Sequence, residues 1–404
     1  MKKQVFLWLV WLGGALPSAA LTLAELQNLA VTHSLDRQGL LAQTQADQEV
    51  ARAAEAMRLP RVSGAVDTGW DDTVGGWQTS VNATLTWDLA ALVDRQPSEA
   101  AFRARQDLWQ TQSMTDQLRL DVALSWARLL VLSREVHEDS RLAHFFETHL
   151  DHLQRMKAEG VDLTWDILRV KNQLSALRTA SLSTASSLQD QLALLTRLIG
   201  RTVTLSEVDF SASASLSRFD PQYWHQNLAA LVAACPKVQA AQVGVQAAQA
   251  QGERARLAWL PQLKAYGGYQ PTSLGPNRKW GVSADFLLAD WGSQEALSKS
   301  YRSLCQAQSS QETAIREKLI QELETLIRGT TVTHQVWLQS QGEFKNADEA
   351  LKEAQELYHE GRIKETDLLG AALDWEGAKT RVSDAQRAFL QEAFTLKSLY
   401  GGKQ

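Results

Sequence analysis

The eight histidines of this 404-residue chain are the first candidates for chemistry, because imidazole is both a general base and a common metal ligand. None of them lies in an HExxH zinc motif, and the sequence contains neither a GxSxG nucleophile motif nor a phosphate-binding loop. His144, His149 and His152 lie close together, and we expect them to form a polar helix face rather than a metal site. The sequence therefore predicts no enzyme, no metal ion and no cofactor.

Other reactive side chains gather around two glycines. The segment EGVDLTWD contains Gly160 and Asp166, and the segment YHEGRIKETD contains Tyr358, Gly361, Arg362 and Asp367. Both glycines interrupt long amphipathic stretches. We therefore expect each one to end a helix and turn the chain.

The N-terminal segment MKKQVFLWLVWLGGALPSAA predicts export. It has two lysines, an apolar core over residues 5–16, and small residues at Ser18 and Ala20, where a signal peptidase would cut. We expect a signal peptide over residues 1–20. An uncleaved anchor is the alternative, but the core is shorter than the ~20 residues that a spanning helix needs.

Charge and cysteine content add two limits. The formal charge is -5, and loss of Lys2 and Lys3 makes it -7, which argues against a nucleic-acid partner. Cys235 and Cys305 could pair in an exported protein or remain small buried thiols, and the sequence leaves both possibilities open.

The sequence contains an internal repeat, whose two copies are related by a single offset of 201 residues. Leu59-Pro60 returns as Leu260-Pro261, and Glu159-Gly160 returns as Glu360-Gly361. The shared offset favours duplication over chance matches. We expect a first repeat over residues 21–200, a linker over 201–221 and a second repeat over 222–404.

Each repeat has the same order of elements. An amphipathic helix (about 35–58 and 237–259) stops at Leu-Pro, because proline disfavours a helical residue before it. Two strands follow, over 61–70 and 77–88 in the first repeat and over 262–270 and 279–288 in the second. A stretch of 62 residues without glycine or proline, from Ser98 to Glu159, would be about 93 Å long as a helix.

The strand WQTSVNATLTWD, residues 77–88, alternates apolar and polar side chains and so has one apolar face. A tilt near 45° would give its eleven residues from Trp77 to Trp87 a height of roughly 25 Å, as in a membrane barrel. Four strands cannot close a barrel, so two or three chains would share one, unless the sheet is a soluble, half-buried one. The aromatic residues that we expect at the membrane interface are Trp70, Trp77, Trp87, Tyr269 and Trp280.

The doubled layout, the two Leu-Pro pairs before strands, the segment FLLADWG at residues 286–292 and the two Gly-to-Asp segments resemble the TolC-like outer membrane efflux proteins. The resemblance implies a mainly α fold with a small β part, in which long α-helical hairpins form a periplasmic tunnel and four strands per chain join a shared transmembrane β-barrel. It also implies a homotrimer in outer membrane lipid, with a large periplasmic portion, that meets an inner-membrane pump through a periplasmic adaptor protein.

The resemblance further implies that the two glycine turns lie at the periplasmic tip, where Asp166, Tyr358 and Asp367 match gating or acidic-ring positions. Arg362 departs from the pattern, because the gating arginine of the family stands one residue later, at Ile363. Three copies of Asp367 around one axis would form a like-charged ring, which Arg362 or Lys364 could offset. Alternatively, these charges are a solvated helix-turn surface.

Two functions therefore stand at this point. The first is a passive exit duct of a tripartite efflux or type I secretion system. The second is a soluble periplasmic coiled-coil scaffold without a pore.

Overall fold

The structure is a computed structural model that describes residues 20–56, 58–71, 75–161, 163–211, 219–257, 260–272, 275–285 and 292–400. The expected signal peptide lies outside these residues except for Ala20, as do residues 286–291 of the FLLADWG segment. The chain forms two compact units. Unit 1 contains the described parts of Met1–Ser34, Leu118–Pro221 and Ile327–Ser398, and unit 2 contains those of Leu35–Gln117, Gln222–Leu326 and Leu399–Gln404.

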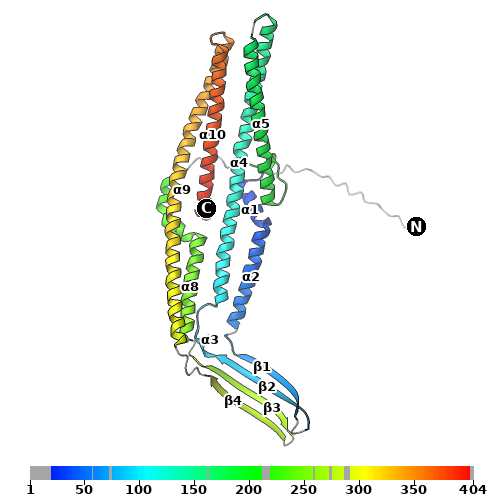
Figure 1. The fold of residues 1–404 in the computed structure, drawn as a ribbon, viewed down its shortest axis with the longest axis vertical. Helices are drawn as coiled ribbons and strands as arrows, with labels where there is room; N and C mark the ends of the chain where they lie inside the picture. Colours follow the sequence, from blue (N-terminus) through cyan, green and yellow to red (C-terminus); the bar gives the residue numbers. More distant parts are fainter. Residues whose placement is uncertain are drawn as a thin grey trace, which may run out of the picture. The chain divides into compact units, whose positions relative to one another are not determined.

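Long helices and four strands make up most of the described chain (Figure 1). The elements of the first half are α1 (Leu23–His33), α2 (Leu35–Ala56), β1 (Arg61–Asp71), β2 (Gly76–Asp88), α3 (Leu89–Val93), α4 (Glu99–Ala158), α5 (Thr164–Ile199) and the short 3-10 helix η1 (Leu205–Glu207). Those of the second half are α7 (Pro221–Ala234), α8 (Pro236–Leu257), β3 (Gln262–Thr272), β4 (Gly275–Asp285), α9 (Ser293–His359) and α10 (Glu365–Tyr400).

The element bounds repeat the offset of the sequence. Helix α8, strand β3 and helix α10 each begin and end 201 residues after α2, β1 and α5. The compact units do not follow the two halves of the chain, because each unit takes helices from both. The repeat and linker boundaries therefore stay a prediction about the sequence.

The strands form one antiparallel sheet in the order β1-β2-β3-β4 (Figure 1). The register pairs Val66 with Val81 and Trp70 with Trp77, so these side chains share a face. Val81 in turn pairs with Tyr269, and Ala265 pairs with Val282, which carries the same face across all four strands.

This apolar sheet face is exposed in the single chain. Trp77 is 72% exposed, Val282 75% and Trp280 87%, values that a soluble core would not allow. Arg278 is the one charged residue that the register of the described strands places on this face. The other exposed apolar members are Val62, Val66, Trp70, Val81, Leu85 and Tyr269.

The second hairpin differs from the prediction. Strand β4 begins at Gly275 instead of Lys279, so Trp280 lies in the middle of the strand and not near its start. Strands β3 and β4 extend beyond the predicted ends, and Pro271 pairs with Pro276 in this added part. There β3 has no partner in β2. Proline has no backbone N–H, so it is tolerated in a strand where no hydrogen bond to a neighbouring strand is needed. Residues 286–288, predicted as strand, and the side chain of Trp87 lie outside what the structure describes.

The two longest helices are α4 and α9, and α4 matches the predicted stretch from Ser98 to Glu159. Helix α4 has 60 residues and α9 has 67, or about 90 and 100 Å at 1.5 Å per residue. Among the described residues, no single helix has the length and apolarity to cross a membrane, although α7 and α8, bent by 42° at their break, meet this test as a pair.

Unit 1 is held together by a core between two helical hairpins, α4 with α5 and α9 with α10 (Figure 1). Leu153 of α4, Val170 of α5 and Trp375 of α10 are all at most 1% exposed. The remaining buried members are Leu142, Phe146, Ile167, Leu174, Leu177, Leu351, Leu368, Leu369 and Ala372. The heptad-like spacing of these residues explains why helices with polar outer faces stay together.

Part of the segment predicted as a linker is packed in unit 1. Leu21 forms a parallel bridge with Val208, and the indole Nε1 of buried Trp126 donates to the carbonyl of Asp209 at 3.0 Å. Phe210 lies 5.6 Å from the Trp126 ring. Both cysteines are free, Cys235 buried and Cys305 half-buried.

In unit 2, the carboxyl groups of Asp47 in α2 and Asp107 in α4 meet. Burial, the hydrogen bond with Asp47 and the charge of Asp47 raise the pKa of Asp107 to about 6. The folded protein therefore binds this proton more tightly than the unfolded chain, and the stabilisation present at pH 4 is lost as the pH rises through about 6.

We accordingly predict that Asp107→Asn, which keeps the shape of the protonated acid, leaves the thermal midpoint unchanged at pH 4.5 and raises it at pH 8. A rise of about 2 °C or more is expected. Thermal unfolding followed by circular dichroism at both pH values measures it. An equal shift at the two pH values would contradict a shared proton.

Candidate gating site at the helix turns

The two predicted glycine turns join the helices of each hairpin in unit 1. Gly160 follows α4 with φ 101°, and Gly361 follows α9 with φ 72°, a region that favours glycine. In both turns the residue after the glycine donates to the carbonyl five residues earlier, Val161 to Met156 at 3.2 Å and Arg362 to Leu357 at 2.8 Å. This is the Schellman arrangement, which satisfies the carbonyls of a helix end.

The charged residues of the second turn are paired locally. Arg362 contacts Glu360 at 3.2 Å, with both side chains more than half exposed. The Oδ2 atom of Asp367 accepts from the backbone N–H of Lys364 at 3.2 Å and so caps the start of α10. Within one chain, Arg362 therefore contacts another acid rather than Asp367.

A contact that the sequence analysis missed lies beside these turns. The Nε2 atom of His149 is 2.7 Å from both Oε1 and Oε2 of Glu365, the first residue of α10. His149 is 6% exposed and the Glu365 side chain 10%. The expected polar helix face is thus wrong for His149, which points into the protein because α10 supplies a buried acid 216 residues away.

Tyr358 belongs to the same cluster. Its ring meets the His149 ring edge-on at 5.1 Å, and the His149 ring also stacks with Phe145 at 5.9 Å. Burial, the charge of Glu365, a hydrogen bond with Glu365 and the charge of Asp166 raise the pKa of Tyr358 to about 12. The structure therefore brings Tyr358 and Asp166 into one electrostatic environment, together with His149 and Glu365.

A cavity of about 450 Å³ adjoins this cluster, between α4, α9 and α10. Beside it Asp348 accepts from Arg141 at 2.8 Å, Lys352 at 2.7 Å and the indole of Trp375 at 3.1 Å. Burial would raise the pKa of Asp348, but the hydrogen bonds from Lys352, Arg141 and Trp375 and the charge of Arg141 lower it to about 2. The acid is therefore ionised and ties α9 to α4 and α10.

Histidines 144, 149, 152 and 359 all border this cavity. His152 lies 5.8 Å from His359, ring to ring. Among the residues that the structure describes, no group of three or more histidine, cysteine or acidic side chains is arranged to hold a metal ion.

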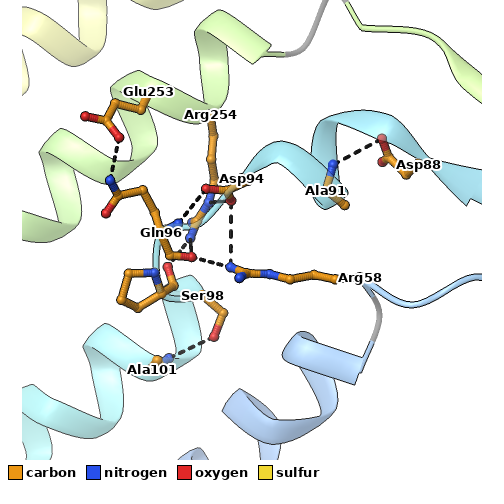
Figure 2. Close-up of polar contacts among 10 residues, drawn as sticks. Arg58, Asp88, Ala91, Asp94, Gln96, Ser98, Ala101, Glu253 and Arg254 are labelled. Carbon is orange, nitrogen blue, oxygen red and sulfur yellow. Dashed lines mark hydrogen bonds and ion pairs between the residues drawn. The ribbon is translucent and has the colours of Figure 1, made fainter.

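A second polar cluster lies in unit 2, where β2 leads through α3 into α4. Figure 2 shows Asp94 between the guanidinium groups of Arg58 and Arg254, with Oδ2 distances of 3.8 and 2.7 Å. Arg58 also donates to the carbonyl of Gln96, and Arg254 to that of Pro97. The two arginines thus fix the crossover that follows the first hairpin.

The internal repeat gives no indication of this second cluster, because its residues have no counterparts of the same type at the offset of 201 residues. Residues 201 positions away from Arg58, Asp94 and Arg254 are Trp259, Glu295 and Ala53. The arginine pair therefore belongs to one crossover only. A comparison of the repeats for positions that differ could have found it.

The predicted interface aromatics lie on the apolar sheet face. Trp70 and Trp77 meet edge-on at 6.1 Å where β1 turns into β2, whereas Tyr269 lies three residues before the end of β3. Trp280 lies in the middle of β4, as described above, and the side chain of Trp87 is outside the described part.

The comparisons with known proteins agree with this geometry. Residues 228–402 match the family model described as "Outer membrane efflux protein". No curated protein matches the chain.

Solved structures share the fold over almost the whole chain. Crystal structures of CusC, concerned with folding and transmembrane channel formation, match with a TM-score of 0.77 and 14% identity, over 94% of this chain and 92% of that one. A membrane protein from Pseudomonas aeruginosa matches with a TM-score of 0.75 and 15% identity, over 95% and 92%. The outer membrane protein VceC from Vibrio cholerae matches with a TM-score of 0.73 and 18% identity, over 94% and 96%. The second half of the chain is therefore similar to the outer membrane efflux protein family, and nearly the whole chain shares the fold of these solved outer membrane proteins.

Proposed function

We propose that the chain forms the outer membrane exit duct of a tripartite efflux or type I secretion system, a passive conduit from the periplasm to the exterior. The apolar sheet face carries the proposal. It spans four strands, is exposed in the single chain, and has a polar face behind it. Such a sheet suits lipid on one side and a water-filled lumen on the other.

Four strands are too few to close, since membrane barrels have at least about eight. Three copies of the chain would supply twelve strands, and the hairpins α4–α5 and α9–α10 would supply the wall of a periplasmic tunnel. The interface residues Trp70, Trp77, Trp87, Tyr269 and Trp280 would then lie at different heights along tilted strands. This arrangement accounts for the length of α4 and α9, which no single globular core requires.

The turns at Gly160 and Gly361 are the proposed periplasmic tip. Asp166, Tyr358, Arg362 and Asp367 would control the opening there, with Arg362 free to exchange Glu360 for an acid of a neighbouring copy. The exposed Arg362–Glu360 pair supports this role, because an ion pair in water is weak and easily exchanged.

Fractionation and conductance test the proposal. Full-length protein should appear in the outer membrane fraction as a heat-modifiable trimer, and the purified trimer should open conducting pores in planar bilayers. Recovery of all the protein in a salt-washed soluble fraction would instead support the scaffold without a pore.

The partners would be a periplasmic adaptor and an inner-membrane pump. Beside the Gly160 turn, Trp165 is 85% exposed, with Leu168 at 49% and Val161 at 44%. An exposed tryptophan flanked by apolar side chains is typical of a protein contact.

We predict that Trp165→Ala weakens adaptor binding by at least about tenfold, or 1.4 kcal/mol, without loss of trimer. Co-purification of cross-linked adaptor and pump with the detergent-solubilised protein measures the effect. Arg169→Ala, one turn further along α5, is the matched control and should bind normally. Equal recovery with Trp165→Ala would exclude this surface from the contact.

A further inference from the structure

We propose that His149 positions the gate of this duct, by holding Glu365 and with it the first turn of α10 against α4. The inference rests on the proposed function, because it assigns a task to residues at the proposed tip. His149 would act through Glu365 and Tyr358, with no contact to the transported substrate.

The hold, the contact between His149 and Glu365, is buried and involves both oxygens of the carboxylate. Both carboxylate oxygens of Glu365 lie 2.7 Å from the same ring nitrogen, and both side chains are at least nine-tenths buried. Glu365 is also the first residue of its helix, where the positive end of the helix dipole favours a carboxylate. Removal of His149 would leave this buried carboxylate with its hydrogen bond to Tyr358 but without the imidazole that contacts both of its oxygens.

Three helices meet at this hold. His149 comes from α4, Tyr358 from the last turn of α9, and Glu365 from the first turn of α10, so Tyr358 and Glu365 lie on the two sides of the Gly361 turn. Phe145, which stacks on the imidazole, and Tyr358, which meets it edge-on, restrict the plane of the ring. Arg362 lies in the turn between Tyr358 and Glu365, and Asp367 lies in the first turn of α10 with Glu365, so a change in the hold would move both proposed gating charges.

Imidazole is the side chain whose charge most often changes between about pH 5 and 8, so the test of the hold includes pH as a variable. Protonated His149 would donate a charge-assisted hydrogen bond to Glu365, about twice as strong as a neutral one. The other titratable or charged groups around it are His152 and His144 on α4, Tyr358, His359, Lys352 and Asp348 on α9, Asp166 on α5, and Arg141 on α4. Asp348 and Arg141 form an ion pair with each other. The carboxylate in direct contact with His149 is that of Glu365.

The test is leak conductance of the reconstituted full-length protein at pH 5.5 and pH 8. Wild type should leak less at pH 5.5, by at least about threefold. His149→Gln and Glu365→Gln should each raise the leak at pH 5.5 and remove the pH dependence, and the double variant should leak no more than the worse single one. His144→Gln, on the same helix and cavity, is the matched control and should behave as wild type.

Two results would overturn the inference. One is a wild-type pH profile retained in His149→Gln, and the other is a double variant whose leak is the sum of two independent effects. Circular dichroism and trimer yield show whether a variant has folded. If wild type itself forms no pores, the proposed function fails, whereas pores with unaltered gating in both single variants refute only the role of His149.

Discussion

Arginine in place of Val81 should keep the protein out of the outer membrane. Val81 is 47% exposed and lies in the middle of the apolar face, opposite Val66 and Tyr269. A charge at the lipid-facing midplane costs about 2–4 kcal/mol per chain, and three copies in one barrel would each carry it. The expected result is loss of the heat-modifiable trimer from the outer membrane fraction.

The neighbouring residue supplies the control. Ser80→Arg adds the same side chain on the polar face, beside Asp67, and should leave insertion unchanged while altering conductance. Comparison of the two variants separates the effect of the face from the effect of charge. Normal insertion of Val81→Arg would refute a lipid contact for this face.

Replacement of Lys379 by methionine should destabilise unit 1 by about 3–5 kcal/mol. Lys379 of α10 and Asp139 of α4 form a hydrogen-bonded ion pair with 10% and 4% of their side chains exposed. The substitution leaves Asp139 buried without its cation, and it also removes a positive charge near Glu135. Thermal and urea unfolding of the detergent-solubilised protein measures the loss.

Two further variants make this result specific. The double variant Lys379→Met, Asp139→Leu replaces both charges by apolar groups and should recover most of the stability. Lys299→Met breaks an exposed pair with Glu295, whose side chains are about 70% exposed, and should cost less than about 1 kcal/mol. Equal losses in Lys379→Met and Lys299→Met would show that burial of the pair is unimportant.

Most of the secondary structure could be predicted, because local rules decide it. Proline at positions 60 and 261 ends the preceding helices within a few residues of the predicted ends. The absence of glycine and proline from Ser98 to Glu159 predicted α4 to within one residue at each end. The predicted start of β4 lies four residues too late, because proline and glycine near a turn predict a break, whereas Pro271 and Pro276 pair where β3 has no partner in β2.

The candidate site could be predicted only in part. The glycine turns follow from the helical pattern and Tyr358 from the resemblance to the TolC-like family, whereas the sequence predicts a polar face for His149 because its partner Glu365 is distant in sequence. The clamp of Arg58 and Arg254 on Asp94 was missed for the same reason, since Arg254 is 160 residues from Asp94. Neither contact repeats with the offset of the duplicated halves.

The sequence by itself determined the order of the elements, the faces of the strands and the turn positions, because each depends on neighbours within a few residues. Only the tertiary structure decided that α4, α9 and α10 share one core and that His149 meets Glu365. It also decided that the apolar face of WQTSVNATLTWD has no cover within the described part of its own chain. Long-range pairing depends on which of many complementary groups come together, and residue spacing carries no record of that choice.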